Sequence, residues 1–156
     1  MTTLYVDNIA PNLQSSVAIP GHVIQVVSTK NVLQTESSFA AETSLMSATI
    51  TPSSTSSKIL VLISANGCAI RSGSTDWKCY YRRGSTYINA IGTYIGINTS
   101  GPQPIGVSIA DIDTPATTSA VTYTVYGNRR SGSGDCIFNY SDGSNASTIT
   151  LMEIAG

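Results

Sequence analysis

Short segments in which apolar and polar residues alternate recur along the chain. In Ala120–Tyr126, the residues Val121, Tyr123 and Val125 are expected to face inward, while Thr122, Thr124 and Tyr126 face outward. A period of two predicts half-buried strands, and clusters of Gly, Pro, Asn and Ser separate the segments. The other predicted strands are Thr3–Ile9, His22–Leu33, Leu45–Thr51, Lys58–Ala65, Trp77–Arg83, Tyr87–Ile91, Thr93–Asn98, Ile105–Ile112, Cys136–Tyr140 and Thr148–Ile154.

Three segments carry more specific expectations. Lys58–Ala65 is apolar at consecutive positions, so both faces of this strand are expected to be covered. Ser37–Ser47 is the only candidate helix, and a loop followed by a strand is the preferred interpretation. Asn128–Asp135, with sequence NRRSGSGD, is expected to be a glycine-rich loop. The pattern predicts an all-β fold, an antiparallel, jelly-roll-like β-sandwich.

A domain boundary is expected near Pro20-Gly21. Residues 1–20 hold too few apolar groups to fold alone and are interpreted as an extended arm that needs a partner, whereas residues 21–156 form the sandwich. The alternative is an ordinary first strand paired within its own sheet. The arm's candidate attachment residues are Leu4, Val6, Ile9, Val17 and Ile19.

Composition narrows the function. Only 11% of residues are charged and the net charge is −1, against about 25% charged in average domains, so no nucleic-acid partner is expected. No apolar run approaches the roughly 20 residues of a membrane span, and the first residues do not resemble a secretion signal. Cys68, Cys79 and Cys136 form no C-x-x-C pair, and this odd number of cysteines favours free thiols and synthesis in a reducing cytosol.

Candidate catalytic chemistry is sparse. His22 is the single histidine, and a surface or turn position is favoured over a catalytic role. Asp111 and Asp113 share a strand face, as a glycosidase pair or a calcium site would require. The favoured alternative is an Asx turn opened by Asp113, with Asp111 facing solvent. Neither catalysis nor a metal or cofactor is therefore expected.

Aromatic residues near turns are the stronger recognition signal. A tyrosine offers a rigid ring and a hydroxyl at a low entropic cost, which suits contact with sugars or proteins. The alternative is that strand-borne aromatics belong to the core. The candidate receptor or glycan contacts are Trp77, Tyr87, Tyr94, Asp142 and Asn145.

Several segments, taken together, resemble the virion fibre and appendage proteins of tailed bacteriophages, especially those of marine and cyanobacterial hosts. They are TLYVDNIAPN, VAIPG, SSTSSKILV, RRGST and the C-terminal STITLMEIA. The resemblance is one of pattern and covers nearly the whole chain, although no long shaft separates arm from sandwich. It implies a trimeric, non-enzymatic virion component attached to other virion proteins through its arm.

Three hypotheses follow. The first is a short fibre that binds a host surface glycan or protein receptor. The second is a capsid decoration or head-fibre protein that stabilises or adorns the shell. The third is a soluble lectin-like module.

Overall fold

The computed structural model describes residues 19–71, 74–96, 101–140 and 145–156, apart from the side chains of residues 93 and 94. Within these ranges the chain forms strands and turns and no helix, which confirms the all-β class. The strands are β1 (Val23–Asn31), β2 (Thr35–Ser37), β3 (Thr43–Ile50), β4 (Lys58–Ile70), β5 (Asp76–Arg83), β6 (Thr86–Ile95), β7 (Ile105–Asp113), β8 (Val121–Ser131), β9 (Cys136–Phe138) and β10 (Ser147–Ile154).

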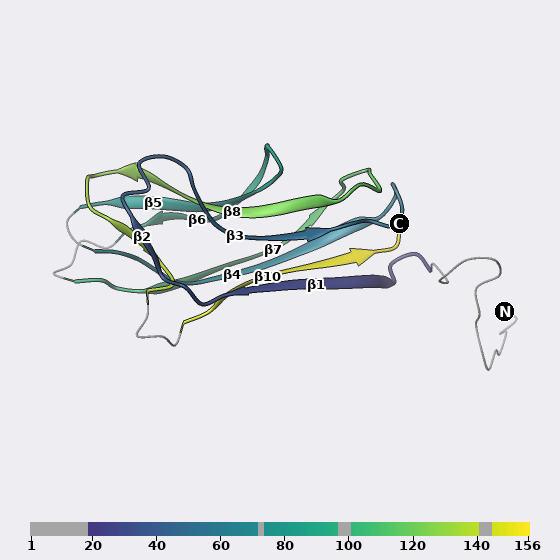
Figure 1. Cartoon of the computed structure of the whole chain (residues 1–156), viewed down its shortest axis with the longest axis horizontal. Coiled ribbons are helices and arrows are strands. Elements are labelled where there is room, and N and C mark those ends of the chain that lie inside the picture. The colour runs from purple at the N-terminus through teal and green to yellow at the C-terminus, as the bar shows by residue number, and fades with distance from the viewer. Residues whose placement is uncertain (1–18, 72–73, 97–100, 141–144) are drawn as a thin grey trace, which may run out of the picture.

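Two antiparallel sheets lie face to face, so the predicted β-sandwich is confirmed (Figure 1). One sheet has the order β1-β10-β4-β9-β2, with β7 also paired to β4, and the other has the order β3-β8-β5-β6. Every paired strand runs antiparallel to its neighbour. We call the first the β4 sheet and the second the β8 sheet.

The core lies between the sheets and follows the alternation of the strands. Ile59, Val61 and Ile63 project from the β4 sheet and are at most 1% exposed. Tyr123 and Val125 project from the β8 sheet and are fully buried. The inward positions predicted for Ala120–Tyr126 are thus correct at these two residues, because a strand sends successive side chains to opposite faces.

Strand β4 is longer than predicted because it changes partners at a glycine. Its first part pairs with β10 and β7, and Ala69 and Ile70 pair with β9. The register shifts between Ala65 and Cys68, where Gly67 has φ +62°. A Cβ on Gly67 would lie 2.6 Å from the backbone nitrogen of Tyr140. Glycine fits this position because it has no Cβ and adopts positive φ without strain.

Other boundaries also differ from the predictions. Asn128–Asp135 is not entirely a loop, because β8 continues to Ser131 and pairs with Asp76–Lys78 of β5. Strand β6 covers both Tyr87–Ile91 and the first residues of the strand expected at Thr93–Asn98, whose last residues lie outside the described ranges. The interpretation of Ser37–Ser47 as loop followed by strand is confirmed by the bounds of β2 and β3. Strands β4 and β5 follow each other in the chain but belong to different sheets.

The expected cover on both faces of Lys58–Ala65 is wrong for the single chain. Ile59, Val61, Ile63 and Ala65 face the core, but Leu60 and Leu62 are only half-buried on the outer face of the β4 sheet. The described part of this subunit places no second layer over them.

The two ends of the sandwich differ in what they carry. Gly21 donates its amide to Ala155, and Ala155 donates to the carbonyl of His22, so the start of the described chain lies beside the C-terminus (Figure 1). The end of β4 and the starts of β7 and β10 lie at the opposite end of the sandwich (Figure 1). Of the predicted arm, Leu4, Val6, Ile9 and Val17 lie outside the described residues, and Ile19 is 51% exposed.

Candidate functional site

Trp77 is a core residue, so its predicted role as a surface contact is wrong. Its side chain is fully buried, its ring meets that of Phe39 edge-on at 5.1 Å between centroids, and its Nε1 donates to the Ala69 carbonyl at 3.0 Å. Alternation within Trp77–Arg83 places Trp77 on the same face as Tyr81, which is also fully buried. Proximity to a turn in sequence did not make Trp77 accessible.

The other predicted contacts fall in different places. Tyr87 is 49% exposed on β6. Asn145 is half-buried, and its Nδ2 donates to the Tyr140 carbonyl at 2.5 Å. Tyr94 belongs to β6 but its side chain lies outside the described residues, as does all of Asp142. Among the predicted aromatic contacts whose side chains the structure describes, Tyr87 is the one exposed to solvent.

Tyr87 belongs to a group of tyrosines on the outer face of the β8 sheet. The ring of Tyr80, on β5, lies 5.4 Å from that of Tyr87 and 5.9 Å from that of Tyr126, on β8. Tyr80 is only 3% exposed because its neighbours cover it, whereas Tyr126 is half-buried. We call these three residues, with Lys78 and Arg82, the tyrosine surface.

Two cations lie over these rings. The Lys78 Nζ is 4.8 Å from the centroid of Tyr80, and the Arg82 Cζ is 5.7 Å from Tyr80 and 5.6 Å from Tyr126. All three contacts are within the range of cation–π attraction. Glu42 accepts a hydrogen bond from the Tyr80 hydroxyl. It also forms an ion pair with Arg82, with 2.7 Å between Glu42 Oε2 and Arg82 Nη2. Burial, and then the hydrogen bond to Glu42, raises the pKa of Tyr80 above its usual value.

The tyrosine surface can bind a ligand by stacking of its aromatic rings and by attraction to its cations. Tyr87 and the exposed part of Tyr126 offer faces for a sugar ring, and Lys78 offers a cation beside them. The sequence contains part of the signal for this group, because alternation along Trp77–Arg83 puts Lys78, Tyr80 and Arg82 on one face of the strand, and Tyr126 is expected to face outward. Which strands lie side by side, and hence that these residues meet, depends on the pairing of β5 with both β6 and β8.

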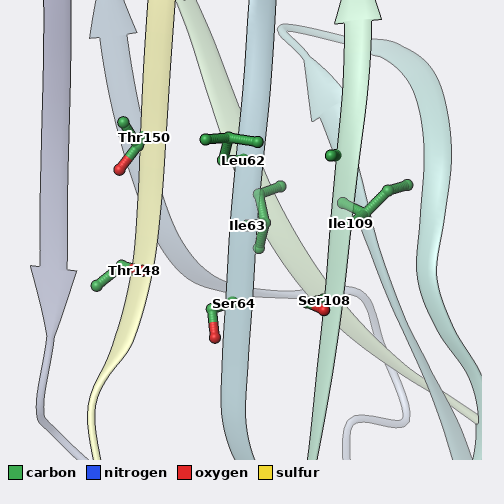
Figure 2. Close-up of a pocket in the computed structure, with 8 residues that line it drawn as sticks. Leu62, Ile63, Ser64, Ser108, Ile109, Thr148 and Thr150 are labelled. Carbon is green, nitrogen blue, oxygen red and sulfur yellow. The ribbon is translucent and has the colours of Figure 1, made fainter.

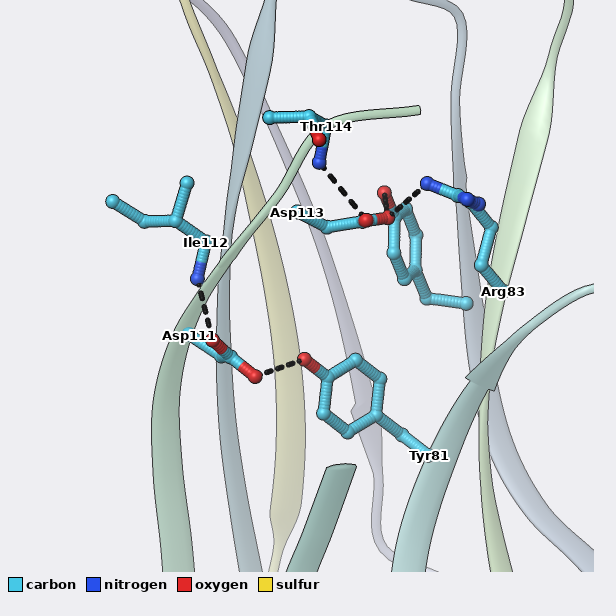
Figure 3. Close-up of polar contacts among 7 residues, drawn as sticks. Tyr81, Arg83, Asp111, Ile112, Asp113 and Thr114 are labelled. Carbon is cyan, nitrogen blue, oxygen red and sulfur yellow. Dashed lines mark hydrogen bonds and ion pairs between the residues drawn. The ribbon is translucent and has the colours of Figure 1, made fainter. Parts of the chain in front are cut away.

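Asp111 and Asp113 each join β7 to the facing β8 sheet (Figure 3). Asp111 Oδ2 accepts hydrogen bonds from the Tyr81 hydroxyl at 2.8 Å and from Asn89 at 3.0 Å. The hydrogen bond from Asn89 contributes most to lowering the pKa of Asp111, so this carboxylate is ionised at neutral pH and is a poor general acid. The expectation of a solvent-facing Asp111 is also incorrect, because Asp111 is half-buried.

Asp113 anchors a second connection between the sheets (Figure 3). Its Oδ2 accepts from the Tyr123 hydroxyl at 2.7 Å and from Arg83 Nη1 at 2.6 Å, and its Oδ1 accepts from the Thr114 amide at 2.9 Å. The bond from the Thr114 amide is local, as expected for an Asp at the start of a turn, although the sequence predicted no contact of Asp113 with the other sheet. Both carboxylates are occupied by structural donors.

The remaining candidates for chemistry are the histidine and the three cysteines. His22 is exposed at the start of β1, and among the described residues no group of three or more His, Cys, Asp or Glu side chains could hold a metal ion. Cys68, Cys79 and Cys136 are buried and unbridged. In the described ranges, no helix is long and apolar enough to span a membrane.

The outer face of the β4 sheet is the second surface of interest. Strand pairing places Val26, Met152, Leu60 and Ile112 side by side across β1, β10, β4 and β7. Beside this row lies a shallow hollow of about 410 Å³, which Figure 2 shows across β10, β4 and β7. The residues that line it are Leu62, Ile63, Ser64, Ser108, Ile109, Ala110, Thr148 and Thr150.

Comparison with known proteins gives a limited result. No protein-family model matches the chain, and no curated protein matches it. Solved structures with some likeness include particles derived from infectious bursal virus (TM-score 0.44, 14% identity, 95% of this chain and 41% of that chain). The VP2 subviral particle of infectious bursal disease virus gives a TM-score of 0.44 at 15% identity, over 95% of this chain and 42% of that chain.

This chain thus spans about two fifths of the length of those viral chains. Identities this low bear on the fold alone, and TM-scores below 0.5 do not identify this chain with them.

Proposed function

We propose that the chain is a non-enzymatic structural component of a bacteriophage particle, a short appendage that is attached through residues 1–20 and contacts the host surface. The sequence resemblance suggests this class. The all-β sandwich, the low charge and the use of Asp111 and Asp113 as structural acceptors support a structural role.

The observation that carries the proposal is that the two ends of the sandwich hold different parts of the chain. Hydrogen bonds from Gly21 to Ala155 and from Ala155 to His22 hold the start of β1 beside the end of β10. Ile19, where the described chain begins, therefore lies near the end of the sandwich that holds Ala155, and the end of β4 and the starts of β7 and β10 lie at the opposite end (Figure 1). An attachment at residues 1–18 would leave that opposite end directed away from the particle.

Deletion of residues 2–18 tests the attachment. The deletion keeps Ile19–His22, whose backbone hydrogen bonds close this end of the sandwich. We expect a protein whose single tryptophan, Trp77, keeps its native fluorescence but which no longer joins particles assembled in the host. A deleted chain that still joins particles would contradict the attachment role. Labelling the full-length protein on particles distinguishes a tail appendage from a capsid decoration, since label on the head would favour the latter.

Carbohydrate binding is the second candidate function, and the tyrosine surface favours it. The measurement is binding of the full-length protein to an array of host polysaccharides. We expect Tyr87→Ala and Lys78→Ala to lower binding at least tenfold, because they remove the exposed ring and the adjacent cation. Thr49→Ala, on the same outer face of the β8 sheet, is the matched control and should bind normally. Equal binding by all variants would remove the tyrosine surface from the proposal.

A further inference from the structure

Lys78 is a cation of the tyrosine surface that has no acidic partner among the described residues. Its Nζ lies 4.8 Å from the centroid of the Tyr80 ring, and the ion pairs of the described chain do not include it. On the neighbouring strand β8 it is paired with Asn128, which is neutral. The charge of Lys78 is therefore left to solvent or to a ligand.

Arg82 adds a second cation, which one shared carboxylate compensates. Its Nη2 forms the ion pair with Glu42, and the same carboxylate also accepts the hydrogen bond from the Tyr80 hydroxyl. The Arg82 Nε is buried and has no hydrogen-bond partner within the described ranges. Two cations and one carboxylate leave this surface with one excess positive charge, in a chain whose net charge is −1.

The outward positions beside the tyrosine surface add no negative charge. Those of the adjoining strands are Ser47 and Thr49 on β3 and Thr122, Thr124 and Asn128 on β8. Asp76, at the start of β5, is paired with Arg130 at 3.1 Å. An uncompensated cation on a neutral surface attracts anions, so the charge of this face favours an anionic ligand.

The three tyrosine rings form a platform that is in place before a ligand binds. Tyr80 lies between Tyr87 and Tyr126, and its ring plane is inclined by 32° to the first and by 26° to the second. The hydrogen bond from its hydroxyl to Glu42 fixes the middle ring. Side chains that are already held lose little freedom on binding, and the exposed parts of the outer two rings can stack on a sugar ring.

The backbone beneath these rings offers little to an extended peptide. Strand β5 pairs with β6 and β8, and β8 pairs with β3 and β5, so the backbone donors and acceptors of both strands are largely used within the sheet. Peptides that bind a sheet commonly add a strand at its edge. Recognition on this face depends instead on rings, hydroxyls and a cation, which suits a saccharide better than a peptide.

We propose that the tyrosine surface binds an acidic saccharide, whose ring stacks on Tyr87 and Tyr126 and whose carboxylate or sulfate group contacts Lys78. The inference rests on carbohydrate binding as the second candidate function and adds the charge of the ligand. A lysine ammonium group is a compact charge without the fork geometry of arginine, so it accepts either anion. Arg82 remains paired with Glu42 beside Tyr80.

Matched ligands test the charge requirement on the unmodified, full-length protein. Titration calorimetry compares short galacturonic acid oligosaccharides with their methyl esters, which keep the rings and lose the charge. Sulfated and unsulfated galactan oligosaccharides form a second pair and distinguish a sulfate from a carboxylate as the anion. We expect the charged member of at least one pair to bind about fivefold more tightly at low ionic strength, and the preference to shrink in about 0.5 M salt.

The outcomes separate this inference from the function on which it rests. Equal binding of the charged and uncharged members of both pairs would overturn the acidic ligand and leave carbohydrate binding in place. Binding of none of the four ligands would overturn this inference together with the carbohydrate-binding candidate. Polyglutamate that binds as tightly as the acidic oligosaccharides would overturn the assignment to a saccharide.

Two lysines allow a matched comparison of variants. Lys78→Gln should lose the preference for the charged ligand, because it keeps much of the side chain over Tyr80 but removes the charge, and Lys78→Arg should keep the preference. Lys58→Gln removes the same charge from an exposed position on β4 and should bind like the unmodified chain. Tyr87→Ala should weaken the binding of charged and uncharged ligands by the same factor. An equal loss of preference in Lys58→Gln would overturn the role of Lys78, since overall charge would then attract the ligand.

Discussion

The Tyr123 hydroxyl donates a 2.7 Å hydrogen bond to Asp113 Oδ2 and thereby ties β8 to β7 across the sandwich. The same oxygen accepts from Arg83 of β5 at 2.6 Å. Burial, and then this bond to Asp113, raises the pKa of Tyr123 above its usual value, so the hydroxyl stays protonated and remains a donor over the physiological range. A carboxylate that the sequence offered as a catalytic candidate is thus a support for the packing of the two sheets.

Asp113→Ala should lower the free energy of unfolding by about 2–3 kcal/mol, within the range for losing hydrogen bonds to a charged group. The variant removes the acceptor shared by Tyr123 and Arg83, both of which are partly or fully buried. Urea unfolding followed by Trp77 fluorescence measures the effect. Tyr123→Phe, which removes one donor and keeps the ion pair, should cost only about 1 kcal/mol. A change below 0.5 kcal/mol in Asp113→Ala would contradict this role, since about that much is expected of surface substitutions.

Stability should fall in acid, and Glu153 should contribute to the fall. Burial raises the pKa of Glu153, but hydrogen bonds from Ser53, Ser57 and Gln25 outweigh it, so the pKa in the folded protein lies below its usual value of 4.5. A lowered folded-state pKa gives stability that is complete above the unfolded-state pKa and is lost as the pH falls through the folded-state pKa.

We therefore expect the free energy of unfolding to decline below about pH 4.5. Glu153→Gln should be less stable than the unmodified chain at pH 7 and should decline less between pH 5 and pH 3. Urea titrations at several pH values measure both quantities. Parallel pH profiles for the two proteins would show that Glu153 does not contribute to the acid dependence.

The three thiols should be unreactive in the folded protein. Burial raises the pKa of Cys68 and of Cys136 to about 12, and burial, followed by the neighbouring Cys68, raises the pKa of Cys79 well above its usual value. The thiolate is the reactive form of cysteine. A disulfide reagent that releases a coloured thiol should therefore modify none of the three cysteines rapidly in the folded protein at pH 8, and all three in 8 M urea. Fast modification of one thiol without urea would mean that its surroundings open locally.

Gly67→Ala should be strongly destabilising, and Gly84→Ala should be the mild comparison. Both glycines have positive φ, which costs another residue roughly 1–2 kcal/mol. At Gly67 the added Cβ would also meet the backbone of Tyr140 at 2.6 Å, whereas at Gly84 no atom lies within 4 Å. We expect the loss in Gly67→Ala to exceed that in Gly84→Ala by at least about 1 kcal/mol in urea unfolding. Equal losses of unfolding free energy would mean that the backbone around Gly67 adapts to a side chain.

How far the sequence predicts the site is clearest for the tyrosine surface. Alternation assigns Lys78, Tyr80 and Arg82 to one face of their strand, and this is correct because side-chain direction in a strand is a local property. It could not show that Tyr87 and Tyr126 flank Tyr80, since that depends on β6 and β8 both pairing with β5. Trp77 was misassigned for a similar reason: its burial depends on packing against Phe39 and on a hydrogen bond to Ala69, and both residues belong to other segments of the chain.

By itself, the sequence determined the strand-rich class, most strand positions and the inward or outward direction of many side chains, because these follow from the local alternation of apolar and polar residues. Only the tertiary structure decided that β4 changes partners at Gly67, that Asp111 and Asp113 bind tyrosines of the opposite sheet, and that Val26, Met152, Leu60 and Ile112 align. These features depend on which strands become neighbours, and strand order is set by the burial of the whole core rather than by any one segment.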